Sequence, residues 1–175
     1  MTTLRNKLAL LPLIAGLLLG STGIALAHEH HAATAYPAAF ESVKGLAGTW
    51  TGASAMGPCT IAFKVTAGGS AVVETMFPGS EHEMLNVYHP DGDTVRMTHY
   101  CAGGNQPQMQ LSKAEKPNDV RFVAKTATNL PTPTAGFMNE CVLHIVDKDH
   151  LESVWISSDT SKGPAKMVFT LTRSK

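Results

Sequence analysis

The chain has 175 residues and balances 14 Lys and Arg against 14 Asp and Glu, with eight histidines. Its charges form no basic stripe, which argues against nucleic acid as a partner. The sequence also lacks a basic amphipathic helix of the kind that binds membrane surfaces.

Residues 1–27 have the pattern of a secretory signal peptide. Arg5 and Lys7 give a positive start, an uncharged apolar run follows, and Ala25 to Ala27 form the A-x-A pattern that precedes a cleavage site. The apolar run is shorter than the roughly 20 residues that span a bilayer as a helix. We therefore expect cleavage after Ala27, export to the periplasm or the outside of the cell, and no membrane insertion of the mature chain.

Beyond the signal peptide we predict a His-rich flexible tail at 28–36 and one barrel domain at 37–175. A short helix begins this domain, because Phe40, Val43 and Leu46 fall at helical spacing. Short alternating segments then follow, separated by turn signals rich in Gly, Pro and Asp. This pattern is typical of an all-β fold, here a single antiparallel barrel of about ten strands. The predicted strands lie at 49–53, 59–66, 71–77, 82–89, 94–101, 108–113, 119–125, 138–146, 151–157 and 165–172.

The two ends of the predicted domain carry a recognisable pair of features. Gly48 and Trp50 form a Gly-x-Trp on the first strand, just after the helix, and Arg173 ends the last strand. This arrangement resembles the calycins, the group that contains lipocalins and fatty-acid-binding proteins, in which a basic residue of the final strand packs over the tryptophan. The resemblance implies a calycin-like barrel in which Arg173 packs over Trp50.

Two further stretches refine this resemblance. The opening at 46–50 is similar to that of nitrobindin-type haem barrels, but no match to their proximal histidine region follows, so haem is not carried over. A group of secreted bacterial lipocalin-like barrels is more similar, sharing the stretches found here at 69–75, 82–84, 98–101 and 104–107. That group implies a fold and no established activity.

One hairpin can be given a register from its turn. Pro90-Asp91-Gly92 suits a type I turn with a G1 bulge, which pairs His89 with Asp93. Counting outward places Glu83 opposite His99, on the face that we expect to point inward. The predicted ligand cavity is therefore lined by Glu83, Leu85, Met97, His99 and Cys101.

The residue types in this predicted cavity support two interpretations. Glu83, His99 and the Cys101 thiolate suit zinc or copper as ligand types. The alternative is a structural ion pair accompanied by a disulfide or by buried free thiols. Three cysteines in an exported chain leave at least one thiol without a partner within the chain, and the sequence does not choose the pair. The methionines lie on separate predicted strands without clustering, so we interpret them as core residues.

Cleavage after Ala27 would create a second metal hypothesis. The mature chain would begin His28-Glu29-His30-His31, with a histidine at the third position. The free amine, two backbone amides and the His30 imidazole then offer Cu(II) or Ni(II) a square plane of four nitrogens, and His31 offers one more. The alternative is a polar spacer with no function.

These observations lead to one principal functional hypothesis and one alternative. The principal hypothesis is an exported barrel that binds a small apolar or amphipathic ligand and performs no catalysis. The alternative is a metal-binding protein that uses the amino terminus or the Glu83, His99 and Cys101 cluster. The sequence contains no G-x-S-x-G and no H-E-x-x-H motif, so we do not expect an enzyme.

Overall fold

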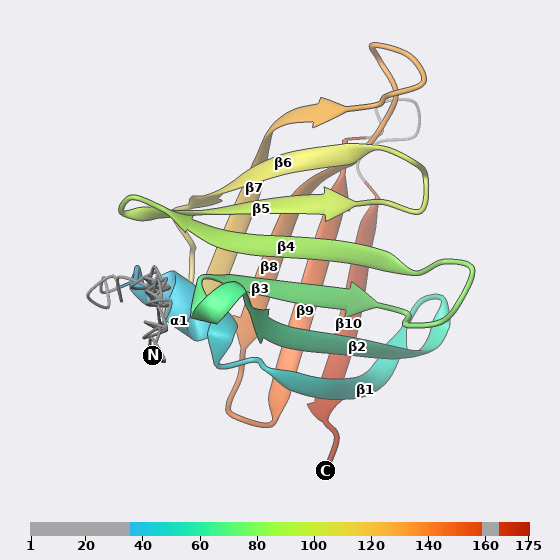
Figure 1. Cartoon of the computed structure of the whole chain (residues 1–175). Coiled ribbons are helices and arrows are strands. Elements are labelled where there is room, and N and C mark those ends of the chain that lie inside the picture. Colours follow the sequence, from blue (N-terminus) through green and yellow to red (C-terminus); the bar gives the residue numbers. More distant parts are fainter. Residues whose placement is uncertain (1–35, 159–164) are drawn as a thin grey trace, which may run out of the picture. The chain divides into compact units, whose positions relative to one another are not determined.

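The computed structural model describes residues 36–158 and 165–175. The predicted signal peptide and the amino-terminal histidines His28, His30 and His31 lie outside the described residues. Within them, helix α1 (Ala38–Lys44) leads into a closed antiparallel barrel of ten strands, which confirms the predicted fold class (Figure 1). The strands are β1 (Gly48–Ser54), β2 (Gly57–Thr66), β3 (Ala71–Met76), β4 (Met84–Asp91), β5 (Thr94–Tyr100), β6 (Gln106–Ser112), β7 (Asp119–Thr128), β8 (Met138–Ile145), β9 (His150–Ser157) and β10 (Lys166–Arg173).

Each strand pairs with its neighbours in sequence, and β1 pairs with β10 to close the barrel. Closure leaves no sheet edge with unpaired backbone groups. The β1–β10 seam depends on Gly52, which opposes Leu171. A Cβ atom at Gly52 would lie 1.9 Å from the carbonyl oxygen of Thr170, so only glycine permits this close approach.

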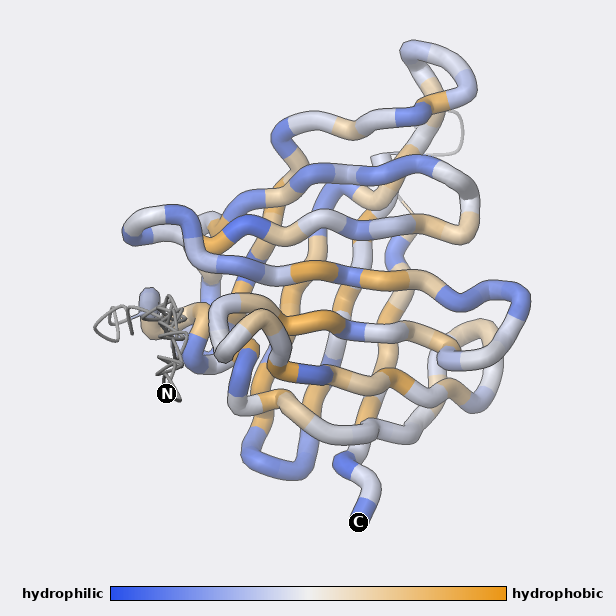
Figure 2. The backbone as a smooth tube through the Cα atoms, in the orientation of Figure 1, coloured by the Kyte–Doolittle hydropathy of each residue, from blue (hydrophilic) through white to orange (hydrophobic). Residues whose placement is uncertain are grey.

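The interior is built by alternation along the strands, with register shifts in β6 between Gln108 and Met109 and in β8 between Met138 and Glu140. Cys59, Ile61 and Phe63 of β2 are buried, as are Cys141 and Leu143 of β8, so these alternate positions face inward. Figure 2 shows hydrophobic residues along the strands and hydrophilic residues at the turns around 91–93 and 147–149. Among the described residues, no helix is long and apolar enough to cross a membrane.

The predicted register of the β4–β5 hairpin is wrong. His89 pairs with Arg96 instead of Asp93, and Asp91 pairs with Thr94. The connection is a two-residue turn made of Gly92 and Asp93. Gly92 adopts φ 63°, as is usual for the glycine at the first central position of a tight hairpin turn. Pro90 therefore belongs to the strand. The observed pairing of β4 with β5 differs from the predicted pairing by an odd number of residues, so the inward and outward faces of β4 are the reverse of those predicted.

This shift removes two residues from the predicted cavity. His99 of β5 is buried as expected, but Asn86 opposes it in place of Glu83. Glu83 lies before β4, where its carboxylate accepts a hydrogen bond of 2.5 Å from the Gly79 backbone N–H. Leu85 pairs with Tyr100 and is only half-buried on the outer face. Asn86 and Tyr88 take the inward positions.

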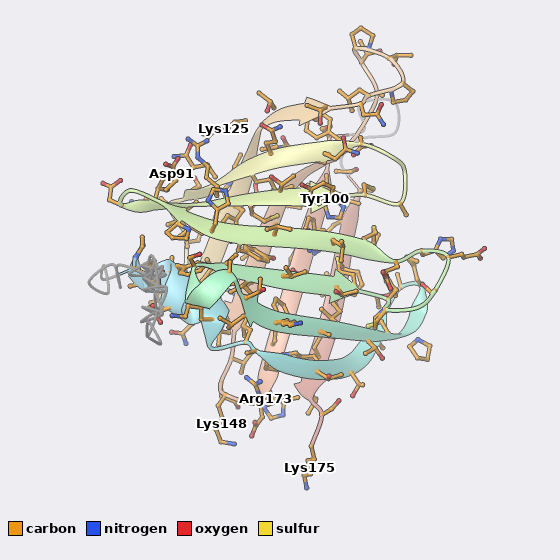
Figure 3. The ribbon with its side chains drawn as sticks, viewed as in Figure 1. Asp91, Tyr100, Lys125, Lys148, Arg173 and Lys175 are labelled. Carbon is orange, nitrogen blue, oxygen red and sulfur yellow. The ribbon has the colours of Figure 1, made fainter. Side chains whose placement is uncertain are left out.

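The end of the barrel next to α1 is sealed by the residues that carry the calycin resemblance. The fully buried Trp50 donates from Nε1 to the Leu46 carbonyl at 2.8 Å, and the Arg173 guanidinium lies 4.2 Å from its ring centre. Arg173 also donates to the carbonyls of Gly45, Ala47 and Lys148. Figure 3 labels Arg173 next to Lys148. The predicted packing of a basic residue over the Gly48-Thr49-Trp50 strand is thus confirmed. Gly48 adopts φ 128°, and a Cβ atom there would come within 3.0 Å of the Arg173 guanidinium.

Candidate functional site

A small recess lies at the distal end of the barrel, defined as the end away from α1. In Figure 1, α1 lies at the left of the barrel, and the connections that follow β3 and β5 lie at the right. The recess is a cavity of about 20 Å³, which is room for roughly one water molecule. We call it the methionine recess, and it is lined by Met76, Met84, His99, Met138, Trp155, Met167 and Phe169.

The topology explains why these residues meet. Met76 ends β3, Met84 begins β4, and the two are directly paired. Met138 begins β8, and Met167 lies near the start of β10 opposite Trp155. Antiparallel order brings the end of one strand beside the start of the next, so residues far apart in sequence line one rim.

A buried polar network continues from the recess into the barrel. Asn86 links its two sides: its Oδ1 lies 2.7 Å from Nδ1 of His99, and its Nδ2 donates to Oε2 of Glu74 at 2.8 Å. The Tyr88 hydroxyl donates to the same Glu74 oxygen at 2.5 Å. Glu74, Asn86 and Tyr88 are fully buried, and His99 is 1% exposed. Four polar side chains therefore form a chain through an interior in which most other buried residues are apolar.

Burial shifts the protonation of this network. Burial raises the pKa of the Glu74 carboxyl to about 7, although the hydrogen bonds from Tyr88 and Asn86 oppose that rise. Burial also lowers the pKa of the His99 imidazole to about 4. Burial and the neighbouring Glu74 carboxyl raise the pKa of Tyr88 well above its usual value. At neutral pH His99 is therefore an uncharged imidazole, and Glu74 lies near its midpoint.

The hydrogen bonds decide which nitrogen of His99 carries the proton. Asn86 directs its amide nitrogen to Glu74, so its carbonyl oxygen faces His99 and accepts from Nδ1. Nε2 then carries the lone pair. Within the described residues, His99 Nε2 and Glu74 Oε1 are buried and have no hydrogen-bond partner. Buried groups of this kind are rare and call for an explanation.

A shallow groove adjoins the recess and shares Met138 with it. This rim groove has a volume of about 350 Å³ and is lined by Cys101, Gly103, Asn105, Gly136, Phe137, Met138 and Ser157. Asn105 is 7% exposed, and its Oδ1 has no hydrogen-bond partner in the described part of the chain. The groove therefore offers polar groups beside the apolar recess.

The structure separates the predicted cavity residues. His99 lines the recess, Cys101 lines the groove, and Met97 is fully buried in the interior without lining either one. Glu83 and Leu85 belong to neither, as the corrected register requires. No three His, Cys, Asp or Glu side chains of residues 36–158 and 165–175 are placed to hold a metal ion, so the predicted Glu83, His99 and Cys101 cluster does not form.

The three cysteines carry free thiols. Cys59 and Cys141 are buried, whereas Cys101 is half-buried beside the rim groove. Burial raises the pKa of the Cys141 thiol well above its usual value, and it raises that of Cys59 as well. A raised pKa keeps both thiols protonated and chemically inert at neutral pH.

Sequence reasoning missed Glu74, Asn86 and Tyr88. A signal was present for Glu74, because Val72, Glu74 and Met76 share one face of their strand, so a carboxyl lies between two apolar residues on the inward side. No comparable signal exists for Asn86 or Tyr88, because the register predicted from the turn puts both on the outer face of their strand.

Comparison with known proteins supports the fold. No protein-family model matches the chain, and no curated protein matches it in sequence. The crystal structure of Rv2717c from M. tuberculosis is similar with a TM-score of 0.60 and 12% sequence identity, covering 81% of this chain and 100% of that one. A redesigned beta barrel is also similar, with a TM-score of 0.38, 14% identity, and coverage of 77% of this chain and 96% of its own. At such identities the likeness to Rv2717c shows a shared barrel fold and nothing of its activity.

Proposed function

We propose that this chain is an exported binding protein that holds a small apolar or amphipathic ligand at the distal end of its barrel and performs no catalysis. The observation that carries the proposal is His99, which lines a recess with otherwise apolar walls and whose buried Nε2 has no hydrogen-bond partner among the described residues. Binding pockets are typically apolar cavities with a few convergent polar groups. A hydrogen-bond donor on a ligand would satisfy this nitrogen.

The size of the recess limits what enters it. A cavity of about 20 Å³ is far below the roughly 300 Å³ or more of a typical ligand pocket. Its walls are mostly methionine, however, which is unbranched and repacks readily. Met84, Met138 and Met167 are only partly buried, so their side chains have solvent on one side. We therefore expect the recess to take the narrow tip of a ligand after these side chains rotate.

The rim groove supplies the place for the rest of an amphipathic ligand. It meets the recess at Met138 and is lined by Cys101, Ser157 and Asn105, whose buried Oδ1 has no partner among the described residues. A narrow apolar tip that carries one hydrogen-bond donor toward His99 Nε2, and a second donor near Asn105 in the groove, would satisfy both unpartnered acceptors. This arrangement favours an amphipathic ligand over a wholly apolar one.

The chemistry of the network favours binding over catalysis. Covalent catalysis needs a nucleophile within hydrogen-bond reach of a base. The fully buried Cys141 thiol has a raised pKa, which disfavours the thiolate that would attack a substrate. His99 has its Nδ1 engaged by Asn86, and its Nε2 meets no hydroxyl or thiol in the described residues.

Export is the part of the proposal that a mass measurement tests. The pattern at 1–27 predicts cleavage after Ala27. When the full-length chain is produced in a bacterial host, the intact mass of the protein recovered from the periplasm should correspond to residues 28–175. Recovery of the uncleaved chain from the cytoplasm alone would contradict export.

Ligand binding is tested with N-phenylnaphthylamine, a neutral apolar dye that fluoresces when it leaves water. The mature protein should bind one dye molecule, and Met138→Asp should weaken that binding about tenfold or more, because it places a charge between the recess and the groove. The measurement is a fluorescence titration at equal protein concentrations.

The matched control is Met56→Asp. Met56 is an exposed methionine in the turn between β1 and β2, and it lines a separate surface hollow that also contains Pro58 and His82. This variant should bind the dye as the parent does. Equal binding by Met138→Asp and the parent, or loss only in Met56→Asp, would move the site away from the distal end and overturn the proposal.

A further inference from the structure

The side chains that line the methionine recess carry potential ligand atoms of one chemical character. Met76, Met84, Met138 and Met167 bring thioether sulfurs, which accept weakly and donate nothing. His99 contributes the lone pair on Nε2, because its Nδ1 proton is engaged by Asn86. The side chains around the recess therefore carry Lewis bases, and the cavity has room for about one water molecule or one bare ion.

The remaining recess residues leave this lone pair unsatisfied. Trp155 lies with its ring centre 4.8 Å from that of His99, but its Nε1 donates to Ser153 Oγ at 3.1 Å. Phe169 has no donor. A hydrogen bond to Nε2 is thus missing within the described residues, although His99 is almost fully buried. Either a donor or a cation would complete the site.

The ligand types decide which cation fits. Thioether sulfur and neutral imidazole are soft and borderline ligands, and this combination suits Cu(I). Mg²⁺ and Ca²⁺ require oxygen ligands, and structural zinc takes cysteine, histidine or carboxylate ligands. The recess lining includes no carboxylate and no thiol. A volume of about 20 Å³ matches a bare ion without its water shell.

We propose that the methionine recess is a Cu(I) site in which His99 Nε2 and the thioether sulfurs of the surrounding methionines are the ligands. Asn86 acts as a positioning residue, since its carbonyl oxygen holds the proton on Nδ1 and turns the lone pair of His99 toward the ion. This inference goes beyond the proposed function, which concerns an organic ligand, and it uses the same recess. It is also independent of the amino-terminal histidines, which would bind Cu(II) or Ni(II).

The test is an anaerobic competition between the mature protein and the Cu(I) chelator bicinchoninate. The background protein carries His28→Ala, His30→Ala and His31→Ala to silence the tail, and Cys101→Ser to remove the half-buried thiol. This background should withhold one Cu(I) per chain from the chelator. His99→Gln should weaken the Cu(I) affinity by about 100-fold or more, because losing a ligand costs at least as much as losing an outer-shell partner.

A pair of methionine variants separates coordination from packing. Met84→Leu with Met138→Leu removes two recess sulfurs with little change in volume, and it should weaken Cu(I) binding as His99→Gln does. Met97→Leu with Met109→Leu makes the same exchange at two buried methionines outside the recess, and it should leave binding unchanged. X-ray absorption of the loaded protein should show sulfur neighbours of copper that diminish in the first pair alone.

The outcomes distinguish this proposal from the proposed function. Dye binding that Met138→Asp weakens as expected, in a protein that withholds no Cu(I), overturns the copper site and leaves the organic-ligand site standing. Cu(I) retained with the expected losses, in a protein that binds no dye, supports the copper site alone. Cu(I) that is retained equally by His99→Gln and by the first methionine pair lies elsewhere and overturns the proposal.

Discussion

Replacing Glu74 by glutamine should change how the stability of the fold depends on pH. The free energy of unfolding of Glu74→Gln, measured relative to the parent protein, should rise by about 3 kcal/mol between pH 4.5 and pH 7. The interval is bounded by the usual pKa of a glutamate, 4.5, and by the value of about 7 to which burial raises the pKa of Glu74.

The sign follows from which state holds the proton. Between these two values the folded state keeps Glu74 protonated while the unfolded state has lost the proton. Stability contributed by this carboxyl is therefore complete below pH 4.5 and is lost as the pH rises through about 7. The amide of the Glu74→Gln variant does not titrate, so the variant escapes the decline and gains on the parent as the pH rises.

His99 produces the opposite trend in the parent protein. Burial lowers its pKa from 6.5 to about 4, so between these values the unfolded state binds the proton and the folded state does not. Stability from His99 is complete above pH 6.5 and is lost as the pH falls through about 4, an effect of roughly 3 kcal/mol. The two groups therefore oppose each other between pH 4.5 and 6.5.

The measurement is urea-induced unfolding of the parent, of Glu74→Gln and of the matched variant His99→Gln. It is repeated at half-unit steps from about pH 4 to about pH 8, a range that covers the titration intervals of both Glu74 and His99. The difference between each variant and the parent isolates one group, because other titrating residues are common to both. The His99→Gln difference should fall with rising pH where the Glu74→Gln difference rises. Parallel curves for the parent and Glu74→Gln would show that Glu74 is not held protonated in the interior.

Trp50→Ala should destabilise the barrel by about 3–5 kcal/mol, the usual cost of truncating a buried aromatic side chain to alanine. Trp50 is fully buried beneath Arg173 and donates to the Leu46 carbonyl. The variant loses the packing between β1 and the end of α1 and leaves Arg173 without its stacking surface. Chemical unfolding followed by far-ultraviolet circular dichroism measures the change.

Two milder variants keep this prediction testable if Trp50→Ala does not fold. Trp50→Phe keeps an aromatic surface and loses the Nε1 hydrogen bond, so it should cost about 1–3 kcal/mol. Arg173→Lys keeps the charge but loses the planar group that stacks on Trp50 and donates to three carbonyls, so it should also be destabilising. A Trp50→Ala protein as stable as the parent would show that the sealed end contributes little to stability.

Much of the fold followed from the sequence alone. Turn residues and alternating apolar positions located all ten strands to within a few residues, because these are local signals with a period of two. Helix α1 and the contact of Arg173 with Trp50 were likewise predictable, the contact through the calycin resemblance. The inward face of β5, which carries Met97 and His99, was also predicted correctly.

The tertiary structure decided the site. Whether Pro90 belongs to the turn or to the strand is a small local choice, yet an odd shift in pairing exchanges the faces of a whole strand. That choice placed Asn86 opposite His99 and left Glu83 outside. The methionines of the recess come from four strands that are spread along most of the barrel sequence, and no local pattern brings them together. Which strand ends lie at the same end of the barrel is set only by barrel closure, a contact between the first and last strands. Sequence periodicity could therefore predict the strands of the barrel but not the site that they enclose.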